Sequence, residues 1–211
     1  MTEREQHNAD RNTEREVCKF LDEHLYKDNP NNLTTTRTDD VREQLAGIDL
    51  YLSSEQLNLD NVTVDEKCAS SYWNKRINTF SFELSFLRNG QLRKGWLIND
   101  SLKTQYYNIC WVNATRQWFK AEDITWLESC LIKKQDILDY LATQNLTLEH
   151  LNIDDQWIRK HVTQKGRIGE GKYDGCVFYF SPQLHEQPIN ILIKKDKLIE
   201  LAELHTEINV T

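Results

Sequence analysis

The chain has 211 residues, of which 39% are hydrophobic and 28% are charged, as is usual for a globular protein. A net charge of -7 argues against a protein that coats nucleic acid by charge alone, but it is compatible with an acidic site neutralised by a divalent cation. No apolar run approaches the ~20 residues of a membrane span, and the polar N-terminus does not resemble a signal peptide. We therefore expect a cytoplasmic protein without membrane contacts.

Cysteine and histidine are spaced in a way that argues against a zinc site. The cysteines are Cys18, Cys68, Cys110, Cys130 and Cys176. They are odd in number and contain no CxxC pair, and the six histidines form no HExxH motif. We expect free thiols in a reducing compartment.

The first predicted element is a helix. Residues 1–12 are polar and are expected to be flexible. Thr13 and Glu16 have the spacing of a capping box, which predicts that the helix begins at Thr13. The "KDNPNN" segment, 27–32, ends it. Residues at helical spacing predict its buried face: Val17, Phe20, Leu21 and Leu25.

Strands are predicted next. Alternating or apolar runs occur at 46–52, 61–68, 79–86, 95–98 and 105–112. The alternative for the run at 105–112 is a short helix. Asn89-Gly90 predicts a hairpin turn after the third run. We expect strands 47–52, 62–68 and 80–87 to be neighbours in one sheet, with helix 13–27 packed on its apolar face.

The remaining elements are mixed. Helical spacing occurs at 132–145, 154–164 and 196–205, and strand-like runs occur at 176–181 and 188–194. The expected fold class is α/β (α+β), with a central mixed sheet flanked by helices. We expect one domain over 13–211, with a core at 13–120 and a helical and strand elaboration at 121–211.

A glycine-rich stretch, "GRIGEGKY" at 166–173, has part of the pattern of a phosphate-binding loop. That motif requires Ser or Thr after the lysine and lies between a strand and a helix. Here Tyr173 follows the lysine, and the segment leads from a helix-like stretch into a strand. We predict a surface connection over 166–175 that binds no nucleotide.

Three charged residues stand out on the predicted strands. Because side chains alternate along a strand, Asp65 and Lys67 share one face of 61–68, and Asp49 lies on the polar face of 46–52. Two carboxylates from neighbouring strands form a pocket suited to Mg²⁺ or Mn²⁺, and a nearby lysine can stabilise charge on a phosphate. The alternative is a solvated face that carries a weak ion pair.

These residues resemble the PD-(D/E)xK nuclease superfamily, which has the restriction-endonuclease-like and Holliday-junction-resolvase-like fold. Its signature is an acid on one strand and acid-x-Lys on the next, after an opening helix that often carries a glutamate. Asp49 and the run Asp65-Glu66-Lys67 match this order, and the resemblance covers 13–88. Ile48 stands where the family often has proline.

The resemblance implies a Mg²⁺-dependent (or Mn²⁺-dependent) nuclease that acts on DNA, with Asp49 and Asp65 as metal ligands and Lys67 as a catalytic residue. Glu14, on the predicted inward arc of the helix, and Glu83, between two serines, are further catalytic candidates. The alternatives are that Glu14 only favours the helix dipole and that Glu83 only faces solvent.

The segment "SYWNKR", 71–76, places aromatic and basic residues directly after the lysine strand. Such residues stack on bases and hold phosphates, so a hairpin tip here would guide nucleic acid. The candidates are Tyr72, Trp73, Lys75 and Arg76, although Trp73 would equally suit a core position.

The leading hypothesis is therefore a metal-dependent nuclease. A non-catalytic nucleic-acid-binding or protein-binding module that keeps the same fold is the alternative. A carbohydrate-active enzyme that uses two carboxylates ranks lower, because Lys67 would have no evident role in it. The sequence leaves open the form of the substrate and the oligomeric state, a homodimer included.

Overall fold

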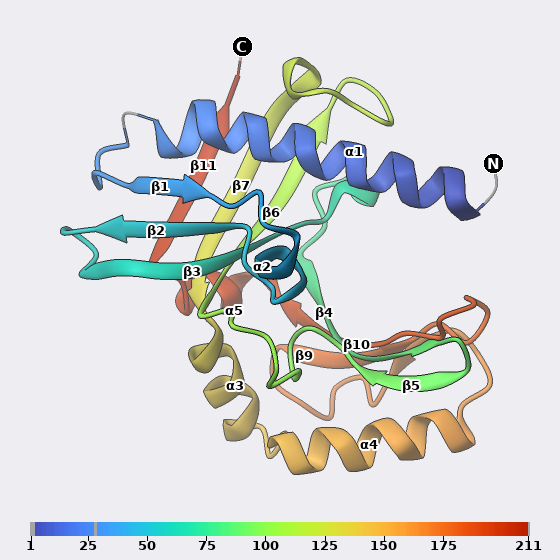
Figure 1. Ribbon diagram of the computed structural model, residues 1–211. Coiled ribbons are helices and arrows are strands. Elements are labelled where there is room, and N and C mark those ends of the chain that lie inside the picture. The colour runs from blue at the N-terminus through green and yellow to red at the C-terminus, as the bar shows by residue number, and fades with distance from the viewer. Residues whose placement is uncertain (1–2, 28, 211) are drawn as a thin grey trace. The chain divides into compact units, whose positions relative to one another are not determined.

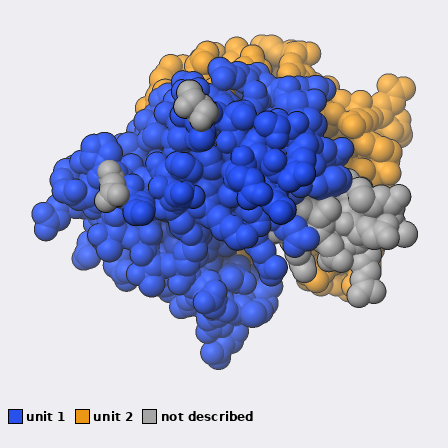
Figure 2. Space-filling model, turned by 90° about the horizontal axis from the view of Figure 1, so that it is seen from above, with its two compact units in different colours: residues 1–77, 103–133, 202–211 blue, residues 78–102, 134–201 orange. Residues whose placement is uncertain are grey.

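The computed structural model describes residues 3–27 and 29–210, with side chains from residue 12 onward. Within it the chain forms two compact units, drawn in blue and orange in Figure 2. Unit 1 comprises residues 1–77, 103–133 and 202–211, and unit 2 comprises 78–102 and 134–201. The units alternate along the chain, so their boundaries do not coincide with the expected division at residue 121. That 13–211 form one domain stays a prediction.

Unit 1 contains a six-stranded mixed sheet with the order β1-β2-β3-β6-β7-β11 (Figure 1). Its strands are β1 (Thr34–Arg37), β2 (Leu50–Ser54), β3 (Leu59–Cys68), β6 (Tyr106–Ala114), β7 (Ile124–Lys133) and β11 (Leu204–Asn209). Strands β3 and β6 are parallel, and all other neighbours are antiparallel. The expected α+β class with a mixed central sheet flanked by helices is confirmed.

Helix α1 (Glu3–Leu21) crosses one face of this sheet and continues into a π-helical turn at Asp22–Tyr26 (Figure 1). The four residues expected on its buried face, Val17, Phe20, Leu21 and Leu25, are at most 3% exposed and lie in the core cluster with Leu50, Leu52 and Val64. The predicted start at Thr13 is wrong, because the helix begins ten residues earlier and Thr13 is buried within it. Residues 3–12 of the N-terminus that was expected to be flexible are part of α1, and residues 1 and 2 lie outside the described residues.

Unit 2 contains an antiparallel five-stranded sheet with the order β5-β4-β10-β9-β8. Its strands are β4 (Thr79–Arg88), β5 (Gln91–Lys94), β8 (Gly166–Ile168), β9 (Cys176–Phe180) and β10 (Ile189–Lys194). The expectation that 80–87 pairs beside 62–68 is wrong, because β4 pairs with β5 and β10 instead. The alternation in β4 reveals two faces but carries no information about its partner.

Helices α3 (Lys134–Thr143), α4 (Leu148–His161) and α5 (Lys195–Glu200) belong to unit 2, and α2 (Val41–Leu45) belongs to unit 1. The hairpin turn at Asn89-Gly90 is confirmed, with positive φ at both residues. Residues 95–98 are not a strand, since only Gln91–Lys94 pair with β4. The helix expected over 196–205 ends at Glu200 and is followed by β11.

The glycine-rich segment contains β8 and a series of turns that lead into β9. It follows α4 and precedes a strand, so its surroundings differ from those of a phosphate-binding loop. Gly169 and Gly171 adopt positive φ in these turns, a conformation that suits glycine. The predicted surface connection is confirmed, and the lack of nucleotide binding stays a prediction. In the described part of the chain, no helix is long and apolar enough to span a membrane.

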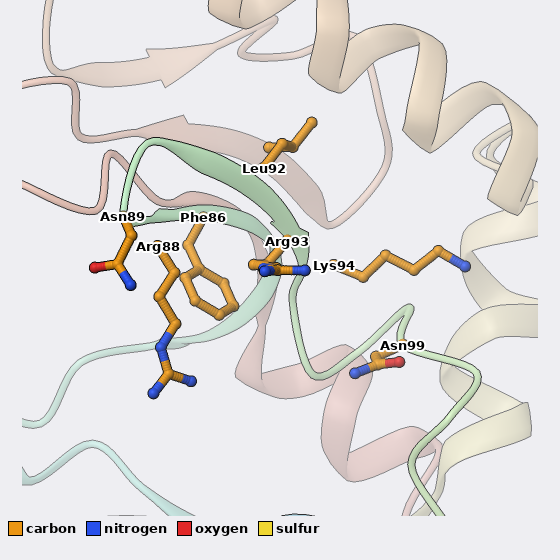
Figure 3. A pocket seen from close by; sticks show the side chains of 7 residues that line it. All are labelled: Phe86, Arg88, Asn89, Leu92, Arg93, Lys94 and Asn99. Atoms are coloured by element: carbon orange, nitrogen blue, oxygen red, sulfur yellow. The ribbon is translucent and has the colours of Figure 1, made fainter.

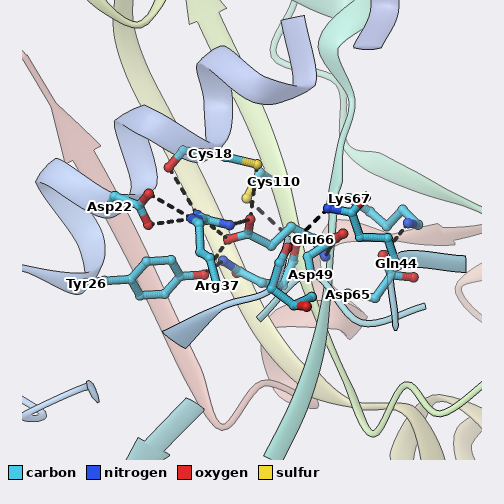
Figure 4. Close-up of polar contacts among 12 residues, drawn as sticks. Cys18, Asp22, Tyr26, Arg37, Gln44, Asp49, Asp65, Glu66, Lys67 and Cys110 are labelled. Carbon is cyan, nitrogen blue, oxygen red and sulfur yellow. Dashed lines mark hydrogen bonds and ion pairs between the residues drawn. The ribbon is translucent and has the colours of Figure 1, made fainter. Parts of the chain in front are cut away.

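A buried polar cluster joins α1, β1 and β3 (Figure 4). Glu66 lies on the α1 face of β3, its side chain is 5% exposed, and its carboxylate accepts from Arg37 at 2.7 Å. The same carboxylate accepts from the Tyr26 hydroxyl at 2.6 Å, and Arg37 also donates to Asp22 at 2.7 Å. Glu66 therefore holds α1 and the edge strand β1 against β3, the strand that carries Asp65 and Lys67.

The cluster predicts unequal costs for two arginine substitutions. Arg37→Ala leaves the buried Glu66 carboxylate without its cation, which costs about 3 kcal/mol or more in unfolding free energy. Arg42→Ala is the matched control, because Arg42 and its partner Asp40 are 90% and 43% exposed, and such pairs contribute about 0–1 kcal/mol. Urea denaturation measures both values. Equal losses for the two variants would contradict a stabilising role of the cluster.

Candidate functional site

The candidate site lies where β2 begins and β3 ends. Asp49 directly precedes β2, and two backbone groups of β3 hold it. Its N–H donates to the Val64 carbonyl at 2.9 Å, and its Oδ2 accepts from the Glu66 N–H at 2.8 Å. Because both bonds are to β3, the pairing of the two strands fixes the position of the Asp49 carboxylate (Figure 4).

Asp65 and Lys67 lie on the face of β3 opposite to Val64 and Glu66, as the alternation predicts. Asp65 is 3% exposed, whereas the Lys67 side chain is 31% exposed. The Lys67 Nζ donates to Asp65 Oδ1. The ammonium group of Lys67 therefore lies between the buried carboxyl group of Asp65 and solvent.

Burial raises the pKa of Asp65 to about 7. The positive charge of Lys67 lowers this pKa, while the charge of Asp49 and a hydrogen bond with its carboxyl group raise it. The carboxyl group of Asp49 therefore lies close enough to Asp65 for its charge to act on the titration of Asp65. That the two carboxylates are close enough to share one cation stays a prediction, as do the catalytic and metal-binding roles of the two residues.

Lys67 remains a cation in this environment. Burial lowers its pKa, but the negative charges of Asp65 and Asp49 more than compensate, and Glu14 contributes in the same direction. Glu14 is exposed on α1, and its charge also raises the pKa of Cys68, after the larger effect of burial. The structure thus brings Glu14 to the end of β3, near Lys67, although it is not buried as the inward arc suggested.

Tyr107 is a neighbour that the sequence did not single out. It is the partner of Asp65 in the parallel pairing of β3 with β6, so both side chains lie on the same face. Tyr107 is fully buried. Burial and, to a lesser extent, the charge of Asp65 raise the pKa of its hydroxyl. The only signal in the sequence was its place in the run 105–112, which does not reveal the partner strand.

Glu83 does not reach the site by the route that the sequence suggested. It lies on β4, in the antiparallel sheet of unit 2, where Asn190 of β10 is its partner. Its backbone carbonyl accepts from the Leu97 N–H at 3.2 Å. The expected pairing beside β3, on which its catalytic role depended, does not exist.

The segment 71–76 is not a hairpin tip, because β3 and β4 lie in different sheets. It continues a short 3₁₀ helix at Ser70–Tyr72. Trp73 packs against the core cluster of unit 1, and Arg76 lies over the Trp126 ring at 4.3 Å. Tyr72 is 49% exposed and Lys75 is exposed. The alternative of a core position therefore holds for Trp73, and nucleic-acid contacts by the other three stay a prediction.

The donor set at the site consists of hard oxygen ligands. No group of three or more His, Cys, Asp or Glu suited to a metal occurs among the described residues. Mg²⁺ is commonly held by one or two carboxylates, with water and phosphate oxygens as the remaining ligands. The chemistry of Asp49 and Asp65 therefore fits this ion, since both supply hard carboxylate oxygens and a divalent cation can replace the proton of the Asp65 carboxyl group.

Comparisons with known proteins give no family for this chain. No family model, no curated protein and no solved structure matches it. A fold class alone does not define an activity. The function has to be inferred from the arrangement of Asp49, Asp65 and Lys67.

The raised pKa of Asp65 predicts a pH dependence of stability in the absence of metal. Between about pH 4, the usual pKa of Asp, and about pH 7, the folded chain binds more protons than the unfolded chain. Stability must therefore fall as the pH rises through this window. Asp65→Asn removes this penalty. The unfolding free energy of the variant minus that of wild type should therefore increase by on the order of 2–4 kcal/mol between pH 4.5 and pH 8.

Urea denaturation in EDTA at a series of pH values measures this difference. Asp60→Asn is the matched control, because Asp60 is an exposed carboxylate on the same strand. A difference between wild type and Asp65→Asn that stays constant with pH would show that Asp65 has an ordinary pKa.

Proposed function

We propose that the chain is a Mg²⁺-dependent nuclease that hydrolyses phosphodiester bonds, with DNA as the substrate that the resemblance indicates. One observation carries this proposal: a buried carboxylate, a second carboxylate close enough for its charge to act on the first and a lysine lie together at one end of β3. Such a cluster is costly for a scaffold, because burial raises the pKa of Asp65 to about 7 and so penalises its ionised form. Perturbed carboxyl groups of this kind are concentrated at functional sites.

Each residue has a separate role in the proposal. Asp49 and Asp65 hold the cation, which when bound polarises the phosphate and lowers the pKa of a water molecule. Lys67 stabilises the negative charge that develops on the phosphate or orients the water. The charge of Glu14, on α1, helps to keep Lys67 protonated.

The order of elements supports the same proposal. Helix α1 precedes an antiparallel series β1, β2 and β3. The first acid stands at the start of β2, and the Asp65-Glu66-Lys67 run stands on β3. This is the helix, acid strand and acid-x-Lys strand order of the PD-(D/E)xK superfamily.

A non-catalytic binding module is the second candidate, and one observation favours it. Lys67 already pairs with Asp65, and the carboxylate of Asp49 accepts from the Glu66 N–H. The cluster is therefore held together without a cation. In this case the charged residues would serve only to join β2 to β3.

Cleavage assays on two variants distinguish the candidates. Asp65→Asn removes the negative charge that a bound Mg²⁺ ion needs. Lys67→Ala removes the ammonium group beside the phosphate. Each should reduce cleavage by about 100-fold or more, the usual effect of removing one such group, whereas Asp60→Asn should cleave like wild type. Wild-type protein that cleaves neither single-stranded, duplex nor branched DNA nor RNA, with Mg²⁺ or Mn²⁺ present, would favour the binding module.

A further inference from the structure

The hairpin of β4 and β5 in unit 2 contains a basic pocket with a volume of about 570 Å³ (Figure 3). Arg88, Arg93 and Lys94 contribute positive charge to its lining, and no carboxylate lines it. In a chain with a net charge of -7, a concave surface lined by three cations needs an explanation.

The pairing of the two strands explains why the arginines converge. Phe86 is directly opposite Arg93, and Arg88 is opposite Gln91. Because residues two apart share a face, Phe86, Arg88 and Arg93 project to the same side of the hairpin. The register of the two strands therefore brings these three side chains to one face of the hairpin.

The two arginines have no carboxylate partner among the ion pairs of the described residues. Arg93 donates to the neutral side chain of Gln91 at 2.7 Å, and no ion pair involves Arg88. Lys94 differs, because Asp100 accepts from it at 3.2 Å. Both guanidinium groups are exposed, so their donors remain available to a ligand with negative charge.

Two asparagines add neutral donors to the pocket. Asn99 Oδ1 accepts from the Ser101 N–H at 3.1 Å and from the Ser101 hydroxyl at 2.8 Å, which assigns the opposite end of the amide as the donor. That nitrogen lies on the side of Arg88, with the Arg93 guanidinium between them, while Asn89 lies beside Arg88 (Figure 3).

We infer that this hairpin pocket binds the phosphodiester backbone of a nucleic-acid strand. Guanidinium forks match the oxygens of a phosphate in a bidentate manner, and the amides provide further donors. The half-buried Phe86 lies beside Arg88 and offers a flat surface on which a base can stack. A free anion or an acidic peptide would have no use for such a surface.

This binding site goes beyond the proposed hydrolysis and does not depend on it. It also differs from the surface that the sequence suggested, since Tyr72, Trp73, Lys75 and Arg76 belong to unit 1. The signal in the sequence was the pattern Phe86-x-Arg88 and Arg93 on either side of the Asn89-Gly90 turn.

Binding in EDTA tests the inference without cleavage. The affinity of the full chain for a labelled single-stranded DNA is measured by fluorescence anisotropy at several salt concentrations. Arg88→Gln/Arg93→Gln should weaken binding by about tenfold or more and reduce the salt slope by about 1.4, the value for two phosphate contacts on a single strand. Arg88→Lys/Arg93→Lys keeps the positive charge but removes the bidentate guanidinium donors. The affinity of this variant for DNA should therefore lie between those of wild type and the glutamine variant.

Lys27→Gln/Lys194→Gln is the matched control, because it removes two exposed cations outside the pocket and should bind within about twofold of wild type. Thermal melting verifies that each variant folds. The inference is overturned if the glutamine variant binds DNA like wild type. It is also overturned if the affinity of this variant for poly-glutamate, anionic vesicles or inorganic phosphate falls by the same factor as its affinity for DNA. Intact DNA binding without any cleavage would instead count only against the nuclease proposal.

Discussion

The alternation of side chains along β3 is the constraint on which the rest of unit 1 depends. Three charged residues follow one another, and the pleat sends Glu66 to one face and Asp65 and Lys67 to the other. On the helix face, Glu66 binds Arg37 and joins β1 and α1 to the sheet. On the opposite face, its two neighbours form the candidate site. A shift of one residue in register would exchange the faces and destroy both arrangements at once.

The two faces use charge in opposite ways. The Glu66 cluster gives its buried carboxylate an arginine and a tyrosine hydroxyl, so burial is compensated. For Asp65, burial and the charge of the neighbouring Asp49 outweigh the effect of Lys67, so its pKa is raised to about 7. A divalent cation can stabilise the ionised form of such a carboxyl group. Under the proposed nuclease function, the stability lost at Asp65 is the cost of a site that binds a cation.

Local patterns predicted the candidate site better than they predicted the architecture. The stripe Val17, Phe20, Leu21 and Leu25 and the alternation around Asp65 are properties of short segments, and both are confirmed. Strand β7 was missed because eight of its ten residues are buried and it shows no alternation. The partner of β4 and the contact of Arg37 with Glu66, 29 residues apart, depend on long-range pairing. No local period encodes such contacts, so Glu83 was placed in the wrong sheet.

The account stands or falls on whether a cation binds between Asp49 and Asp65. The most direct measurement is a crystal structure of the chain soaked in Mn²⁺ at pH 8, with anomalous scattering to locate the ion. The account predicts a peak about 2.0–2.2 Å from an oxygen of each carboxylate, the distance expected for a hard divalent ion of this size, with Lys67 beside it. Peaks only elsewhere, with Lys67 still paired to Asp65, would contradict it.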